Sequence, residues 1–380
     1  MGFRDKIFLF LILILVIAIF VILDLSRLHR DEFLVHNFNE NLKENSFVKD
    51  ITLKERNYVY SKGIYVTFRT AGTKRMDELI DLVKDTELNT MVIDIKDTTG
   101  RIGFDTNSEL INNTGSEKVY ISDIKGLIDR LHQEGIYVIA RQAVFQDDFL
   151  SQKRTDLALK RVGGGLWYDF KGIHWLDPAS REVWDYNLEL AKEAVRAGFD
   201  EINLDYIRFP SDGDMSQIVY PFWDYEIPKQ EIIRQFFEYF TQRVKPMGVF
   251  VSADLFGLTL TTTNDMNIGQ WLEYAVPYFD YICPMVYPSH YPAGFEGYEN
   301  PAAHPYEVIY KGLISGEQRI ASVSVPAKLR PWLQDFDLGA IYTPEMINLE
   351  KKAVYDAGVY GWLLWNPKNI YTEEALIKEE

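Results

Sequence analysis

Two aspartates stand near the ends of apolar runs in this sequence, where carboxyl groups can do acid and base chemistry. Asp205 closes the stretch FDEINLD at 199–205, in which apolar and polar residues alternate as in a β-strand. Asp254 occupies a similar position in the run 248–256. Glycoside hydrolysis needs one protonated carboxyl to assist the leaving group and one ionised carboxylate as nucleophile or base. We therefore predict Asp205 and Asp254 as the catalytic pair, with Asp254 as the acid.

The elements that would position this pair alternate between strand and helix. Three helices are followed by a glycine just before the next strand, at Gly135, Gly198 and Gly358, as is typical of helix C-termini. The predicted strands are 63–68, 90–96, 136–145, 199–207, 248–256, 280–287, 329–336 and 358–365, and the predicted helices between them are 76–88, 121–134, 178–197, 228–244, 268–275, 305–315 and 344–357. Eight such units predict an α/β fold, the (β/α)₈ TIM barrel.

A doubly wound open sheet is the alternative fold. That fold would normally carry a glycine-rich phosphate loop after its first strand, whereas residues 67–72 (TFRTAG) hold one glycine and no P-loop lysine. The barrel is favoured, and its chemistry should lie at the C-terminal ends of the strands.

Charged and aromatic residues gather at those predicted strand ends and in the long segment 146–177. Flat aromatic rings can pack against the apolar faces of sugars, and carboxylates and arginines can bind sugar hydroxyls. The candidate substrate-binding residues are Arg69, Asp97, Arg141, Trp167, Trp175, Arg208, Tyr287, Trp332, Asp335 and Trp365. Neighbouring strands lie about 4.8 Å apart, so the carboxyls of the catalytic pair could take either the retaining or the inverting separation.

Several candidates also have a purely structural interpretation. Asp205 could pair with Arg208 and hold the loop that follows the strand. Asp254 could cap backbone N–H groups of the next turn. Asp97 precedes Thr-Thr-Gly and has the pattern of a turn residue.

Composition excludes some functional classes. Of 380 residues, 47% are apolar and 14% aromatic, enough for a large buried core. The net charge of −16 and the lack of a basic stripe argue against a nucleic-acid partner. Zinc-ligand spacings such as His-Glu-x-x-His are missing, so we expect no metal and no cofactor. A single Cys283 in an apolar run is interpreted as a small buried residue.

The N-terminus predicts a membrane segment. Residues 7–23 are uninterrupted apolar residues that follow Arg4 and Lys6, and no small-residue cleavage site comes after them. We expect a retained single-pass anchor (1–25), a juxtamembrane linker (26–61) and a catalytic barrel (62–380) that lies outside the cytoplasm. The balance of Lys and Arg on the two sides leaves the orientation open.

The sequence also resembles a known family through a series of motifs. They are KGIYVT (62–67), VIDIKDTTG (92–100), YVIARQAVFQD (137–147), WLDPASREVWDY (175–186), FDEINLDYIRFPSDG (199–213), VSADLFG (251–257), ICPMVYPSHY (282–291) and GWLLWNP (361–367). Together they are similar to the bacterial putative glycoside hydrolase barrel family, long catalogued as a domain of unknown function. The resemblance implies a hydrolase barrel that acts on a polysaccharide, in particular a glycan of the cell envelope. A non-catalytic glycan-binding barrel and an envelope interaction platform are the alternatives.

A more distant likeness is to the α-amylase clan, whose nucleophilic aspartate ends the fourth strand and whose acid/base glutamate ends the fifth. Asp205 fits the first position, and Asp254 fits the second in place but not in residue type. Asn203 stands where the clan has an arginine two residues before its nucleophile. The resemblance therefore implies that Arg208 or Arg141 supplies the charge partner.

Overall fold

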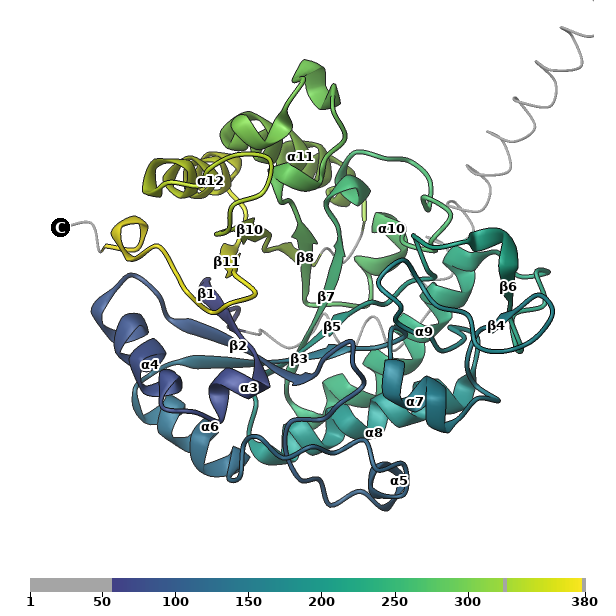
Figure 1. The fold of residues 1–380 in the computed structure, drawn as a ribbon. Helices are drawn as coiled ribbons and strands as arrows, with labels where there is room; N and C mark the ends of the chain where they lie inside the picture. The colour runs from purple at the N-terminus through teal and green to yellow at the C-terminus, as the bar shows by residue number, and fades with distance from the viewer. Residues whose placement is uncertain (1–56, 324–326, 378–380) are drawn as a thin grey trace, which may run out of the picture. The chain divides into compact units, whose positions relative to one another are not determined.

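Eight parallel strand positions, one of them filled by two short segments, close into a barrel in the computed structural model, which describes residues 57–323 and 327–377 (Figure 1). The strands follow the sheet order β10-β11-β1-β2-β3-β5-β7-β8-β9, and a further pairing of β10 with β8 closes the ring. Their bounds are β1 Ser61–Val66, β2 Thr90–Lys96, β3 Tyr137–Ala143, β5 Glu201–Asp205, β7 Phe250–Phe256, β8 Tyr281–Met285, β9 Lys328–Leu329, β10 Trp332–Gln334 and β11 Gly361–Trp365. The predicted TIM barrel is confirmed.

Helices surround the strands in Figure 1 and come between them in sequence. They are α3 Phe68–Ala71, α4 Arg75–Asp85, α5 Glu109–Asn112, α6 Ile124–Gln133, α7 Asp148–Lys153, α8 Arg181–Ala197, α9 Lys229–Val244, α10 Leu272–Ala275, α11 Pro305–Ile320 and α12 Pro344–Ala357. The predicted glycine ends are confirmed for α8 and α12, where Gly198 and Gly358 adopt left-handed backbone angles.

The helix predicted over 268–275 is shorter than expected, because only Leu272–Ala275 are helical. Gly269 has a φ of +82°, and a Cβ at this position would lie 2.9 Å from the carbonyl oxygen of Lys229. A backbone in that conformation belongs to a turn rather than a helix. The fifth βα connection therefore contains two short helical segments, the 3₁₀ turn Gly257–Leu260 and α10.

The predicted seventh strand, 329–336, is divided in two. β9 pairs with β8, whereas β10 pairs with β11 and reaches β8 through Trp332 opposite Met285. Arg330 and Pro331 lie between the two pieces, and proline has no N–H to donate to a ladder. This divided strand closes the barrel and brings Trp332 into its interior.

Side chains of alternate strand residues fill the barrel interior. The buried cluster consists of Tyr65, Val92, Ile139, Tyr281, Cys283, Tyr287, Trp332 and Leu363. Nearer the N-terminal ends of the strands, Arg330 forms a fully buried ion pair with Glu201, to which Tyr137 also donates its hydroxyl. The interior is therefore a packed core, and an open site can lie only at the ends of the strands.

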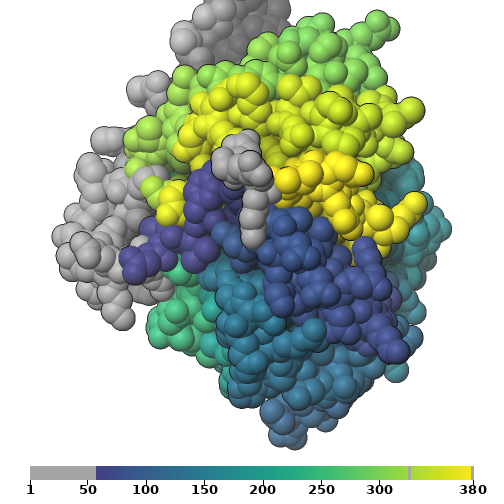
Figure 2. Space-filling model, turned by 90° about the vertical axis from the view of Figure 1, so that its left-hand side faces the viewer, coloured from purple at the N-terminus to yellow at the C-terminus, as the bar shows by residue number. Residues whose placement is uncertain are grey.

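The two ends of the barrel sequence lie side by side. β1 and β11 are paired, and the N–H of Glu87 donates to the carbonyl of Leu376 at 3.0 Å. Glu87 also forms ion pairs with Lys62 and Lys351. Figure 2 shows the yellow C-terminal residues against the purple and blue residues that begin the barrel.

The predicted membrane anchor (1–25) lies outside the described residues, as does most of the predicted linker (26–61). Ser61 already belongs to β1, and the compact unit that holds the barrel starts at Tyr58. In the segments 57–323 and 327–377, no helix is long and apolar enough to cross a membrane.

Candidate active site

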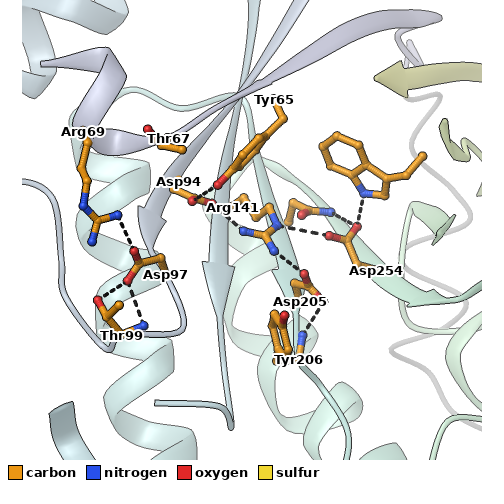
Figure 3. A network of polar contacts seen from close by, with 12 residues as sticks. Tyr65, Thr67, Arg69, Asp94, Asp97, Thr99, Arg141, Asp205, Tyr206 and Asp254 are labelled. Carbon is orange, nitrogen blue, oxygen red and sulfur yellow. Dashed lines mark hydrogen bonds and ion pairs between the residues drawn. The ribbon is translucent and has the colours of Figure 1, made fainter. Parts of the chain in front are cut away.

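Strand register brings the two predicted catalytic aspartates to the same level. In the sheet, Arg141 of β3 lies opposite Asn203 of β5, which lies opposite Ser252 of β7. Asp205 and Asp254 each follow two residues later, so their side chains point to the same face as those of Asn203 and Ser252. Figure 3 shows both carboxyl groups turned toward Arg141.

The buried guanidinium of Arg141 contacts three carboxyl groups from three other strands. Its Nη1 donates to Asp94 Oδ1 at 2.6 Å, its Nη2 donates to Asp205 Oδ2, and its Nε lies 3.5 Å from Asp254 Oδ2. The ring of Trp365 covers it, with 4.8 Å between the guanidinium carbon and the ring centroid. Of the two arginines that the resemblance suggested, Arg141 is the one that pairs with Asp205.

Asp254 is buried, and its surroundings favour the protonated carboxyl. Burial raises the pKa of its carboxyl to about 8, and the nearby negative charge of Asp205 acts in the same direction. Two N–H groups donate to Oδ1 at 2.8 Å, from Asn203 Nδ2 and Trp332 Nε1. These bonds fix the carboxyl, and a protonated carboxyl in this position suits a general acid.

Asp205 is held at the point where β5 ends. Its Oδ1 accepts the backbone N–H of Tyr206 at 2.6 Å, and its Oδ2 accepts from Arg141. Tyr206 has a φ of +53°, which is uncommon for a residue with a side chain. Backbone strain of this kind is found where a structure fixes functional groups. The turn and the arginine together define the position of the Asp205 carboxylate.

Asp94 is a third carboxyl of the site that the sequence analysis did not select. Burial raises its pKa to about 6, while its Oδ2 accepts the hydroxyl of Tyr65. The signal was present in the sequence, since Asp94 interrupts the apolar run of β2 two residues before that strand ends. A charged side chain inside a barrel strand needs a partner, and Arg141 on the next strand supplies one.

A cavity of about 550 Å³ opens above these groups. Seven of the predicted residues line it, namely Asp205, Asp254, Arg141, Arg208, Tyr287, Trp332 and Trp365. The prediction missed further lining residues, among them Lys171, Tyr206, Phe256, His290 and Tyr291. These come from strand ends and loops whose arrangement periodicity does not specify. The volume is in the range of sites that bind small ligands.

Three predicted polar residues lie outside the cavity lining. Arg69 forms an ion pair with Asp97 at 2.7 Å, and Asp97 also accepts the N–H of Thr99 at 3.0 Å (Figure 3). The contact with Thr99 is therefore the one expected if Asp97 is a turn residue. Asp335 is buried and accepts both the N–H and the hydroxyl of Thr372, so its oxygens hold the C-terminal segment.

The two loop tryptophans are buried rather than open to a ligand. Trp167 donates its Nε1–H to the carbonyl of Asp214 at 2.9 Å, and Trp175 donates to Asp169 Oδ2 at 3.1 Å. Both rings are at most 1% exposed. The predicted sugar platform is thus not formed by these rings, because the segment 146–177 folds back on itself through β-bridges and uses them as its own core.

Comparisons with known proteins agree with this fold. A family model described as a putative glycosyl hydrolase domain matches residues 63–371. A search of curated proteins found no match. Among solved structures, a hypothetical protein from Ruminiclostridium thermocellum ATCC 27405 is 38% identical, over 50% of this chain and 96% of that protein, with a TM-score of 0.46.

Two glycoside hydrolases are similar in structure at low sequence identity. The PgaB (BpsB) glycoside hydrolase domain from Bordetella bronchiseptica is 13% identical, over 84% of this chain and 99% of that one, with a TM-score of 0.59. The α-galactosidase TtGalA from Thermus thermophilus is 13% identical, over 87% of this chain and 63% of that one, with a TM-score of 0.52. These two similarities support the barrel fold.

Proposed function

The chain belongs to the family described as a putative glycosyl hydrolase domain, and from that premise we propose a glycosidase that uses Asp254 as general acid and Asp205 as nucleophile or base. The observation that carries the proposal is the pair itself. One buried carboxyl has its pKa raised to about 8, and a second, paired with Arg141, lies beside it in an open cavity. Glycoside hydrolysis uses two carboxyls in different surroundings, one of them held in the protonated form.

The proposed acid step begins with Asp254. Its proton would pass to the oxygen of the scissile glycosidic bond as that bond breaks, which leaves the carboxyl as carboxylate. The charge that forms on Asp254 would be stabilised by the N–H donors of Asn203 and Trp332, which already point at Oδ1. These donors favour the ionised form, so they help the acid to release its proton.

The proposed role of Asp205 depends on its negative charge. As an ionised carboxylate it would stabilise the positive charge that develops on the sugar ring, then either attack the anomeric carbon or activate a water molecule. Arg141 places its positive charge against Oδ2. Tyr287 and Trp365 line the same cavity and offer aromatic surface to a sugar ring.

The substrate we propose is a polysaccharide, in particular a cell-envelope glycan, and the location we propose is the outer side of a membrane. The apolar residues 7–23 support a single-pass anchor, since their number is close to what a bilayer span needs. A barrel attached in this way would meet envelope polymers rather than cytoplasmic metabolites.

The proposal is tested with the full-length chain and the substitutions Asp205→Asn and Asp254→Asn. Release of reducing sugar from envelope glycans should fall about 100-fold or more in each variant, because each loses a group that acts in the transition state. Asp129→Asn is the control, since Asp129 is an exposed residue of α6 that pairs with Lys125. Unchanged activity in both variants refutes the assignment, and glycan binding without turnover under any condition identifies a non-catalytic binding barrel instead.

A further inference from the structure

Arg208 is a buried cation in the cavity lining, and no carboxylate of the described residues forms an ion pair with it. Its side chain lies among aromatic rings, with the guanidinium carbon 4.8 Å from the ring centroids of both Trp175 and Phe256. Its Nη1 donates to the carbonyl of Phe209 at 3.1 Å. Over 57–323 and 327–377, no Asp or Glu oxygen comes within the 4.0 Å of an ion pair with Arg208, although the residue is only 6% exposed.

Burial of a guanidinium without an ion-pair partner costs free energy, which a bound anion would offset. Removal of water from the guanidinium lowers the pKa of Arg208, although Tyr206 and the carboxylates of Asp205, Asp212 and Asp169 act in the opposite direction. The aromatic rings return part of this energy through cation–π contacts. A guanidinium also has five N–H donors in a planar fork, which matches the two oxygens of a carboxylate. The guanidinium of Arg208 thus has a positive charge and N–H donors that no carboxylate of the described residues binds.

A second positive group lines the same cavity. Lys171 is exposed, belongs to the segment 146–177 and forms no ion pair within the described ranges. Partial burial lowers the pKa of the His290 imidazole, and the nearby positive charge of Lys171 lowers it further. An anion that binds beside Lys171 would reduce the repulsion between its charge and a protonated His290.

The carboxylates near Arg208 have other partners, and buried Asp169 accepts from Gln146 and Trp175. Asp205 and Asp254 contact Arg141, and Asp212, which also lines the cavity, accepts the backbone N–H of Phe170 at 3.2 Å. Arg208 and Lys171 come from the loops that carry β6 (Ile218–Val219) and β4 (Lys160–Arg161), which pair with one another. One wall of the cavity thus carries Arg208 and Lys171 together with Asp212, whereas Asp205 and Asp254 contact Arg141.

We propose that this wall binds a sugar unit that carries a carboxylate, with Arg208 in a two-oxygen contact and Lys171 at the rim. The inference rests on the proposed function for the hydrolysis that follows binding. It narrows the class of substrate to acidic glycans. The opposing interpretation is that Arg208 serves only to join Trp175 and Phe256 within the wall.

Binding is measured by titration of the full-length chain with glucuronic acid, N-acetylmuramic acid and glucose, followed by tryptophan fluorescence because Trp332 and Trp365 line the cavity. At least one of the two acids should bind about tenfold or more tightly than glucose, as expected for one charge-assisted contact. A stronger response to glucuronic acid assigns the carboxylate to a uronic acid, and a stronger response to N-acetylmuramic acid assigns it to a lactyl ether. Equal affinity for all three sugars overturns the proposal.

Substitutions locate the contact. Lys171→Gln and Arg208→Lys should each weaken binding of the acid by about tenfold while binding of glucose stays the same. Lys125→Gln is the control, since Lys125 lies on α6 and pairs with Asp129. Lys171 is exposed, so its variant should fold even if the buried Arg208 variant does not. Equal loss of affinity for the acid and for glucose in Lys171→Gln refutes a charge-selective wall.

Turnover separates this inference from the proposed function. Selective binding of acids without hydrolysis of any glycan supports the carboxylate contact and refutes the glycosidase. Hydrolysis of neutral polysaccharides that is faster than hydrolysis of acidic ones supports the glycosidase and refutes the acidic substrate.

Discussion

The protonated state of buried Asp254 has a measurable effect on stability, which Asp254→Asn isolates. An aspartate in the unfolded chain has a pKa of about 3.9, whereas the pKa in the folded barrel is about 8. Between these values the folded state holds one proton more than the unfolded state. The free energy of unfolding of the natural protein therefore decreases as the pH rises, and this contribution is fully lost once the pH passes the folded pKa.

The magnitude follows from the same two values. One proton of difference changes the free energy of unfolding by about 1.4 kcal/mol for each pH unit, or by about 3 kcal/mol between pH 5 and pH 7. Asparagine does not ionise, so the variant lacks this dependence. Its amide oxygen can still accept from Asn203 and Trp332, which keeps the local hydrogen bonds. The variant should accordingly gain stability relative to the natural protein as the pH increases, up to about pH 8.

The assay is urea denaturation of both proteins from about pH 5 to about pH 8, with the difference in unfolding free energy plotted against pH. Asp129→Asn serves as the control for removal of an exposed aspartate. A difference that stays constant over this range would show that Asp254 is ionised in the folded protein, and the assignment of Asp254 as an acid would then be refuted.

Two further predictions concern groups around the site. Trp332→Phe removes the N–H donor to Asp254 Oδ1, which makes the ionised form less favourable, so the alkaline limb of the pH–rate profile should move upward by about one unit or less. An unchanged limb would contradict this prediction. Glu201→Gln leaves the charge of Arg330 buried without its partner, and urea denaturation should show a loss of about 3–5 kcal/mol. A loss under about 1 kcal/mol would mean that the pair contributes little.

The sequence was most informative where strands are regular. Period-two alternation placed Asn203 and Asp205 on the inner face, and the βα repeat placed Asp254 on the neighbouring strand, so the barrel and the pair of aspartates were both predictable. The charge partner was predictable only as a choice between Arg208 and Arg141. That choice depends on the register between neighbouring strands, and alternation within one strand carries no information about register.

The loops were less predictable. Trp167 and Trp175 were expected to face a ligand, but a long segment that folds on itself needs its own apolar core and buries its largest rings. Asp335 was expected at the site, although a residue far along the chain, Thr372, satisfies its oxygens. Lys171 was not considered, since an exposed lysine in a loop shows its position relative to the cavity only in three dimensions.

Arg141 links residues on four strands, and this has a consequence for redesign of the cavity. Asp94 does not line the cavity, yet it shares one guanidinium with Asp205 and Asp254. Replacement of any one of these four side chains changes the charge balance felt by the other three. Variants that transplant this site into another barrel should therefore carry all four residues as a unit, because a copy of the two aspartates alone would lack the positive charge that both contact.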